Sequence, residues 1–73
     1  MLTRAKYMGE GSIGEILKSI RLAKGLTLKQ LGEKTGITPS AISKYEGGKR
    51  KPTMEAFFKL LEALGADLYI MHD

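Results

Sequence analysis

Apolar residues recur at helical spacing in four stretches of the chain, and each stretch follows a Ser or Thr capping residue and stops at a glycine. The pattern predicts helices over about 13–24, 28–35, 39–46 and 54–64. Pro39 would occupy the first position of the third helix, where its missing N–H costs nothing. We therefore expect an all-α, compact four-helix domain over residues 12–65.

The last eight residues, 66–73, break the helical pattern, and Leu68, Tyr69, Ile70 and Met71 have the composition of a short β-strand. A single strand cannot satisfy its own backbone groups, and the sequence offers no obvious second strand. We expect these four residues to form a dimerisation segment that pairs with the same strand of a second copy. The alternative is that the segment folds back over the helices or frays.

The first 11 residues carry Arg4 and Lys6 but no helical pattern, so we expect a flexible N-terminal leader. The alternative is an arm that reaches a nucleic acid. Neither a secretory signal nor an apolar run long enough for a membrane span is present. We expect a cytoplasmic protein that does not enter membranes.

Charge is unevenly distributed along these 73 residues, whose net charge is +4. Between Lys18 and Lys51 there are nine Lys or Arg against two Glu, whereas from Pro52 onward one Lys faces four carboxylates. This asymmetry favours a polyanion as the partner of the middle segment, although lysine-rich helix faces are also often only solvated surface. The chain has no cysteine, which excludes disulfides and thiolate metal sites.

The second and third helices are separated only by a short turn that contains Gly36 and Ile37, and this predicts a steep crossing of two short helices. Gly32 has no side chain to obstruct the close approach of the third helix. The inner face of the third helix carries Ala41, Ile42 and Tyr45. Its outer face carries short polar groups, a proline and a lysine, namely Pro39, Ser40, Ser43 and Lys44.

The stretch LTLKQLGEKTGITPSAISKYEGGKRKPTMEAFFKLLEALG resembles the Xre/Cro-type helix-turn-helix family. Several features fall in register together: Arg21, Gly25-Leu26-Thr27, Leu31, Gly36, Ile42, Glu46, Gly48 and Pro52. The resemblance implies a lambda repressor-like fold that binds double-stranded DNA and regulates transcription, most simply as a repressor. Two positions depart from the family: Gly32 stands where a small alanine-like residue is usual, and Leu28 stands where many members carry Gln.

The resemblance also implies roles for individual residues, with the third helix in the major groove. The expected base contacts are the outer set, Pro39, Ser40, Ser43 and Lys44. The expected phosphate contacts are at the start of the second helix and in the loop after the third, namely Thr27, Lys29, Gln30, Lys49, Arg50 and Lys51. Arg21 and Glu46 are expected to form a structural ion pair.

The alternative function is that of an antitoxin, because a similar short strand follows the fourth helix in the HipB-like branch of the family. Such a protein binds a toxin protein and regulates its own operon. An enzyme is not expected: Ser40 and Lys44 lie one turn apart on an exposed face with no pocket, and His72 stands alone. We expect no cofactor, no metal and no small-molecule ligand.

Overall fold

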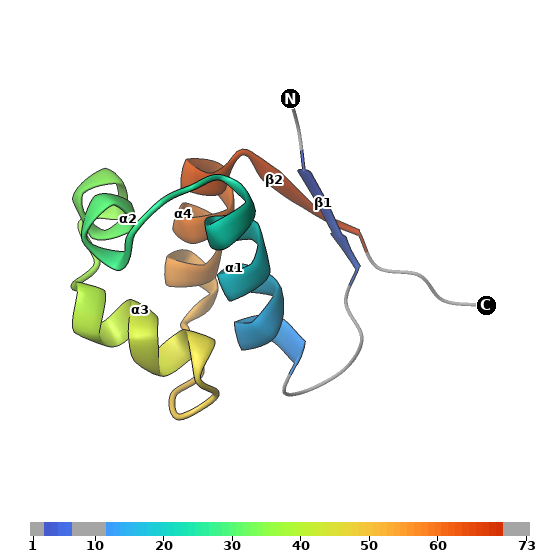
Figure 1. Cartoon of the computed structure of the whole chain (residues 1–73). Coiled ribbons are helices and arrows are strands. Elements are labelled where there is room, and N and C mark those ends of the chain that lie inside the picture. Colours follow the sequence, from blue (N-terminus) through green and yellow to red (C-terminus); the bar gives the residue numbers. More distant parts are fainter. Residues whose placement is uncertain (1–2, 7–11, 70–73) are drawn as a thin grey trace.

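The computed structural model describes residues 3–6 and 12–69. The elements follow one another along the chain as β1 (Thr3–Lys6), α1 (Ser12–Ala23), α2 (Leu28–Thr35), α3 (Pro39–Glu46), α4 (Met54–Leu64) and β2 (Ala66–Tyr69). Figure 1 shows the four helices gathered on one side, with β1 and β2 side by side beyond α1. The expected four-helix, all-α domain is confirmed.

Capping explains why three of the helices begin where they do. The hydroxyl oxygens of Thr27, Thr38 and Thr53 each accept a hydrogen bond from the backbone N–H three residues later, at 3.0, 3.2 and 3.1 Å. Helices α2 and α4 end at Gly36 and Gly65, which adopt the left-handed conformation that favours glycine. The bounds of α2, α3 and α4 agree with the sequence pattern, and α1 runs one residue earlier at both ends.

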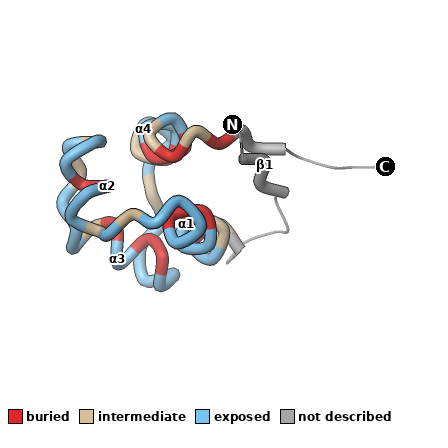
Figure 2. The backbone as a smooth tube through the Cα atoms, turned by 45° about the horizontal axis from the view of Figure 1, so that its top comes forward, coloured by how far each residue is buried: buried red, intermediate tan, exposed pale blue. Residues whose placement is uncertain are grey.

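Every helix contributes to one hydrophobic core. The largest fully buried side chains come from all four, and they are Leu17, Leu31, Ile42, Leu60 and Leu64. Helix α1 packs against α3 and α4, and α2 packs against the same two helices. Figure 2 shows that the buried positions lie on the sides of the helices that face one another. On α4 the outer side leaves Met54 and Phe58 exposed.

Two glycines allow the helices to approach closely. A Cβ atom added at Gly14 would lie 2.3 Å from the carbonyl oxygen of Tyr45, so α1 rests directly on the end of α3. A Cβ atom at Gly32 would lie 2.8 Å from the carbonyl oxygen of Ile37, in the turn between α2 and α3. The sequence indicated the role of Gly32, but nothing in the hydrophobic pattern indicated that of Gly14.

The small sheet corrects the expectation that the chain holds no second strand. Strands β1 and β2 pair in parallel, with Thr3 opposite Ala66 and Lys6 opposite Tyr69. Residues 3–6, which the sequence placed in a flexible leader, therefore form a strand. The physical reason is that backbone pairing needs no apolar side chains, so the polar segment TRAK can complete β2 without showing an apolar pattern. Ile70 and Met71 lie outside the described residues.

Candidate nucleic-acid interface

The turn between α2 and α3 is held by hydrogen bonds that fix the angle between the two helices. The N–H of Gly36 donates to the carbonyl of Gly32 at 2.8 Å. The hydroxyl of Thr35 donates to the carbonyl of Leu31 at 2.9 Å and accepts from the N–H of Ile37 at 3.2 Å. With these groups satisfied, α3 is presented in one orientation relative to α2.

The outer face of α3 carries the four residues expected to contact bases. Pro39, Ser40, Ser43 and Lys44 are all exposed, whereas Ile42, Tyr45 and Glu46 on the opposite side are buried. The exposed face therefore offers two hydroxyls, one ammonium and one apolar ring, all of which can reach a partner without unfolding the helix. Three of these four side chains are short, so a large partner surface could approach the helix backbone closely.

At the start of α2, two of the residues expected to contact phosphates, Thr27 and Gln30, form a capping box. The N–H of Thr27 donates to the side-chain oxygen of Gln30 at 2.8 Å, and the N–H of Gln30 donates to the hydroxyl of Thr27 at 3.0 Å. The first two helical positions, Leu28 and Lys29, keep N–H groups that lack an intrahelical partner by geometry. These two amides, with the exposed ammonium of Lys29, make the start of α2 suitable for an anion.

The loop after α3 carries its cations in a fixed arrangement. Gly48 has a φ of 73°, and the N–H groups of Lys49 and Arg50 both donate to the carbonyl of Lys44, at 2.9 and 3.3 Å. The guanidinium carbon of Arg50 lies 6.0 Å from the centre of the Tyr45 ring, within range of a cation–π interaction. Backbone hydrogen bonds therefore hold this loop against the end of α3, and the loop carries the exposed side chains of Lys49, Arg50 and Lys51.

Arg21 and Glu46 form a buried ion pair that joins α1 to the end of α3. The Arg21 Nε and Nη2 groups donate to the two carboxylate oxygens of Glu46 at 2.7 and 3.0 Å, and Nη1 donates to the carbonyl of Leu26 at 2.8 Å. The hydrogen bond with Glu46 raises the pKa of Arg21 above its ordinary value. The charged guanidinium of Arg21 ties α1, α3 and the turn before α2 together. Two of its five N–H donors remain after these three bonds.

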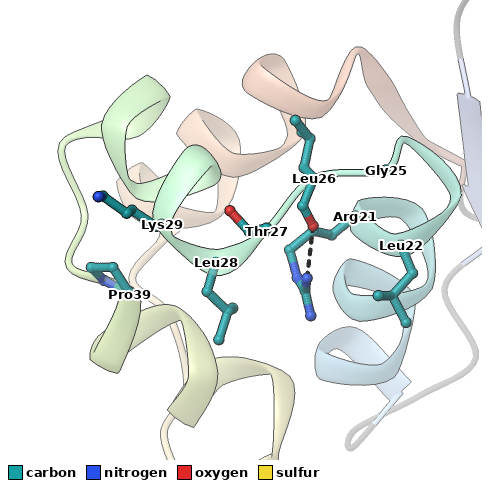
Figure 3. Close-up of a pocket in the computed structure, with 8 residues that line it drawn as sticks. All are labelled: Arg21, Leu22, Gly25, Leu26, Thr27, Leu28, Lys29 and Pro39. Atoms are coloured by element: carbon teal, nitrogen blue, oxygen red, sulfur yellow. Dashed lines mark hydrogen bonds between the residues drawn. The ribbon is translucent and has the colours of Figure 1, made fainter.

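An open depression lies between the end of α1, the start of α2 and the start of α3 (Figure 3). Its lining is mostly apolar and comprises Arg21, Leu22, Gly25, Leu26, Thr27, Leu28, Lys29 and Pro39. Leu28 is half-buried there, and Leu22 is 57% exposed. The sequence pattern identified no such concavity, because it forms only where three separate elements meet.

Within residues 3–6 and 12–69, no group of three or more His, Cys, Asp or Glu side chains could hold a metal ion. Among the helices of these residues, none is long and apolar enough to span a bilayer.

Comparison with known proteins gives a family match and several relatives. A family model described as helix-turn-helix matches residues 17–70. Antitoxin HipB of Escherichia coli (strain K12) is 30% identical over 64 residues, which cover 88% of this chain and 73% of HipB. A putative HTH-type transcriptional regulatory protein of Methanocella arvoryzae is 44% identical over 55 residues, and multiprotein-bridging factor 1 of Candida albicans is 37% identical over 57 residues.

The matches differ in how much of each relative they cover. The match to the Methanocella protein covers 75% of this chain but only 17% of that protein, and the match to the bridging factor covers 78% of this chain but only 38% of the factor. No solved structure matches the chain significantly.

Proposed function

Because the chain belongs to the Xre/Cro-type helix-turn-helix family, we propose that it is a sequence-specific regulator of transcription that binds double-stranded DNA, most simply as a repressor. The observation that carries this proposal is the arrangement around α3. Its exposed face lies between two basic elements, the start of α2 with Lys29 and the loop with Lys49 to Lys51. An extended polyanion could contact both elements while α3 occupies its major groove.

In this proposal α3 reads the bases. Lys44 can donate to guanine O6 and N7, and the hydroxyls of Ser40 and Ser43 can bond to several bases. Pro39 offers only an apolar edge. A good bidentate contact contributes about 1–3 kcal/mol of discrimination, and serines seldom form one. Part of the specificity then comes from the shape and stiffness of the DNA.

The phosphate contacts are assigned to the two flanking elements. At the start of α2 they come from the free backbone N–H groups and from Lys29. The side-chain NH2 of Gln30 and the hydroxyl of Thr27 lie beside them. In the loop they come from Lys49, Arg50 and Lys51. The Arg21–Glu46 pair holds the two halves of this surface together, and we assign it no base contact.

A homodimer is the proposed working form, with pairing along β2. Because β1 occupies one edge of β2, a second copy would pair along the other edge of β2. A two-fold dimer would place two α3 helices about 34–36 Å apart, one turn of DNA. Leu68→Pro removes a backbone N–H from β2 and disfavours a strand there, so it should lower the self-association measured by sedimentation equilibrium. A variant that keeps the wild-type association constant and helical circular dichroism would contradict pairing along β2.

A second function, that of an antitoxin, is favoured by two observations. HipB, named as an antitoxin, is 30% identical to this chain. Helix α4 also exposes two large apolar side chains, Met54 and Phe58, on a surface that the proposed DNA contacts do not use. A toxin protein bound there would leave α3 free, so the antitoxin would still regulate its own operon.

The experiment that tests the main proposal is selection of bound sites from a random duplex library near physiological salt. Enrichment of an inverted repeat with half-sites one turn apart would support a dimeric, sequence-specific regulator. Lys44→Ala provides the matched variant, because it should change the enriched sequence while the fold is preserved. If the library yields no preferred sequence, the regulator proposal fails and the antitoxin function becomes the better explanation.

A further inference from the structure

The first residue of α3 and the first residue of α2 line the same apolar wall. Leu28 and Pro39 line the same open depression, with Leu22 and Leu26 behind them. Figure 3 shows the Leu28 side chain extending from the start of α2 toward α3, on the side of the depression where Pro39 lies. The wall is therefore built by two elements, and it lies at the N-terminal end of α3, the end that faces the bases in the proposed complex.

The position of Pro39 in this wall is fixed by its packing. A Cβ atom at Gly32 would lie 3.3 Å from both Cγ and Cδ of the Pro39 ring, so the ring rests against the backbone of α2. Pro39 also follows the Thr38 cap, whose hydroxyl accepts a hydrogen bond from Ala41. The Pro39 part of the apolar surface is thus held in place by the backbone of α2.

The two side chains that form the wall offer no hydrogen-bonding group. The side chains of Leu28 and Pro39 contain only carbon and hydrogen, and Pro39 lacks a backbone N–H. A base edge that presents only donors and acceptors would lose water here without gaining a partner. Of the four bases, only thymine presents an apolar group, its C5-methyl, in the major groove.

We infer that Leu28 and Pro39 form a specificity element for a pyrimidine C5-methyl group, at the base pair that faces the start of α3. This inference rests on the proposed DNA-binding function. The neighbouring Lys29 and the amides at the start of α2 favour the phosphate backbone beside the wall, which brings the base edge to it. The ligand class is thus DNA in which a thymine occupies that position of each half-site.

The test is uracil scanning of the operator obtained by library selection. Each dT is replaced singly by dU, which removes the methyl group and leaves every hydrogen-bonding group in place, and binding is measured by fluorescence anisotropy. One position in each half-site should lose about fourfold in affinity, the effect of burying one methyl group. Thymines that face Ser43 or lie outside the contacted groove should show no loss.

Protein variants then assign the methyl contact to the wall. In Leu28→Gln the penalty for dU at that position should shrink toward onefold. In Pro39→Ala it should fall in part, because alanine keeps one methyl group that can contact the thymine. Lys49→Ala should weaken binding to the dT and dU operators equally. Thermal unfolding of each variant verifies that the fold is intact.

Each remaining outcome overturns a defined part of the reasoning. A specific operator in which no dU substitution matters would refute the inference and leave the proposed function standing. A dU penalty that persists in both Leu28→Gln and Pro39→Ala would assign the methyl contact to other residues and would also refute it. Absence of any selected site would overturn the proposed function and the inference together.

Discussion

Replacing Gly14 with alanine tests the contact between α1 and α3. In an ordinary helix this change stabilises by about 1 kcal/mol, because glycine loses more backbone freedom on folding. Here the new Cβ atom would lie 2.3 Å from the carbonyl oxygen of Tyr45 and 2.8 Å from that of Glu46. These are backbone atoms that cannot rotate away, so α1 must shift by about 1 Å to restore ordinary van der Waals contact.

The expected cost follows from this shift. Overpacking in a core costs about 1–3 kcal/mol, and two backbone collisions place Gly14→Ala at or beyond the upper end. After the gain in helix propensity is subtracted, we expect a net loss of about 2 kcal/mol. In a domain of this size, that loss lowers the midpoint of thermal unfolding by roughly 8–16 °C.

Gly47→Ala is the matched control for Gly14→Ala. Gly47 has a φ of −83°, and its added Cβ atom would approach other atoms no closer than 3.4 Å. This variant should gain about 0.4–1 kcal/mol, because alanine restricts the unfolded chain. Both are measured by urea unfolding at matched protein concentration, since self-association would make stability depend on concentration. A Gly14→Ala protein as stable as the wild type would refute the close contact between α1 and α3.

Three further variants test other parts of the molecule. Glu46→Ala leaves the buried guanidinium of Arg21 without its carboxylate and should lose about 3–5 kcal/mol of stability in urea unfolding, whereas wild-type stability would show that the pair is dispensable. Thr38→Ala removes the cap of α3 and should lose about 1 kcal/mol, with Thr38→Ser retaining most of it, unless the cap contributes nothing. Lys49→Ala should make the negative slope of log binding constant against log salt shallower by about 0.9, and an unchanged slope would remove Lys49 from the phosphate contacts.

The parts of the fold that sequence alone could predict depend on neighbouring residues. Thr27, Thr38 and Thr53 cap their helices by bonds that reach only three residues along the chain. Gly36 and Gly65 end helices because left-handed backbone favours glycine locally. The exposed face of α3 follows from helical spacing once its start is known. Each of these features is encoded within one or two turns of helix, so the pattern of side chains suffices to locate it.

The features that the sequence did not reveal depend on residues far apart in the chain. Gly14 matters because Tyr45 and Glu46 lie against it, and no periodicity in α1 marks that contact. The cation–π contact of Arg50 with Tyr45 needs the loop to turn back through Gly48. The apolar wall at Leu28 and Pro39 needs the α2–α3 crossing angle. In each case the necessary information is a distance between elements, which a one-dimensional pattern does not contain.

The β1–β2 pair was the hardest feature to predict from the sequence, because its two strands are separated by almost the whole chain. The segment TRAK alternates no apolar residues, and its pairing rests on backbone groups that every sequence carries. The pair forms because of where β2 lies. It follows α4 directly after the left-handed Gly65, and no helix satisfies the backbone groups of a strand. The first strand of the same chain pairs with it because the helices between them bring residues 3–6 and 66–69 to one side. In the proposed dimer, where a second copy pairs along β2, β1 leaves only the other edge of β2 for that pairing.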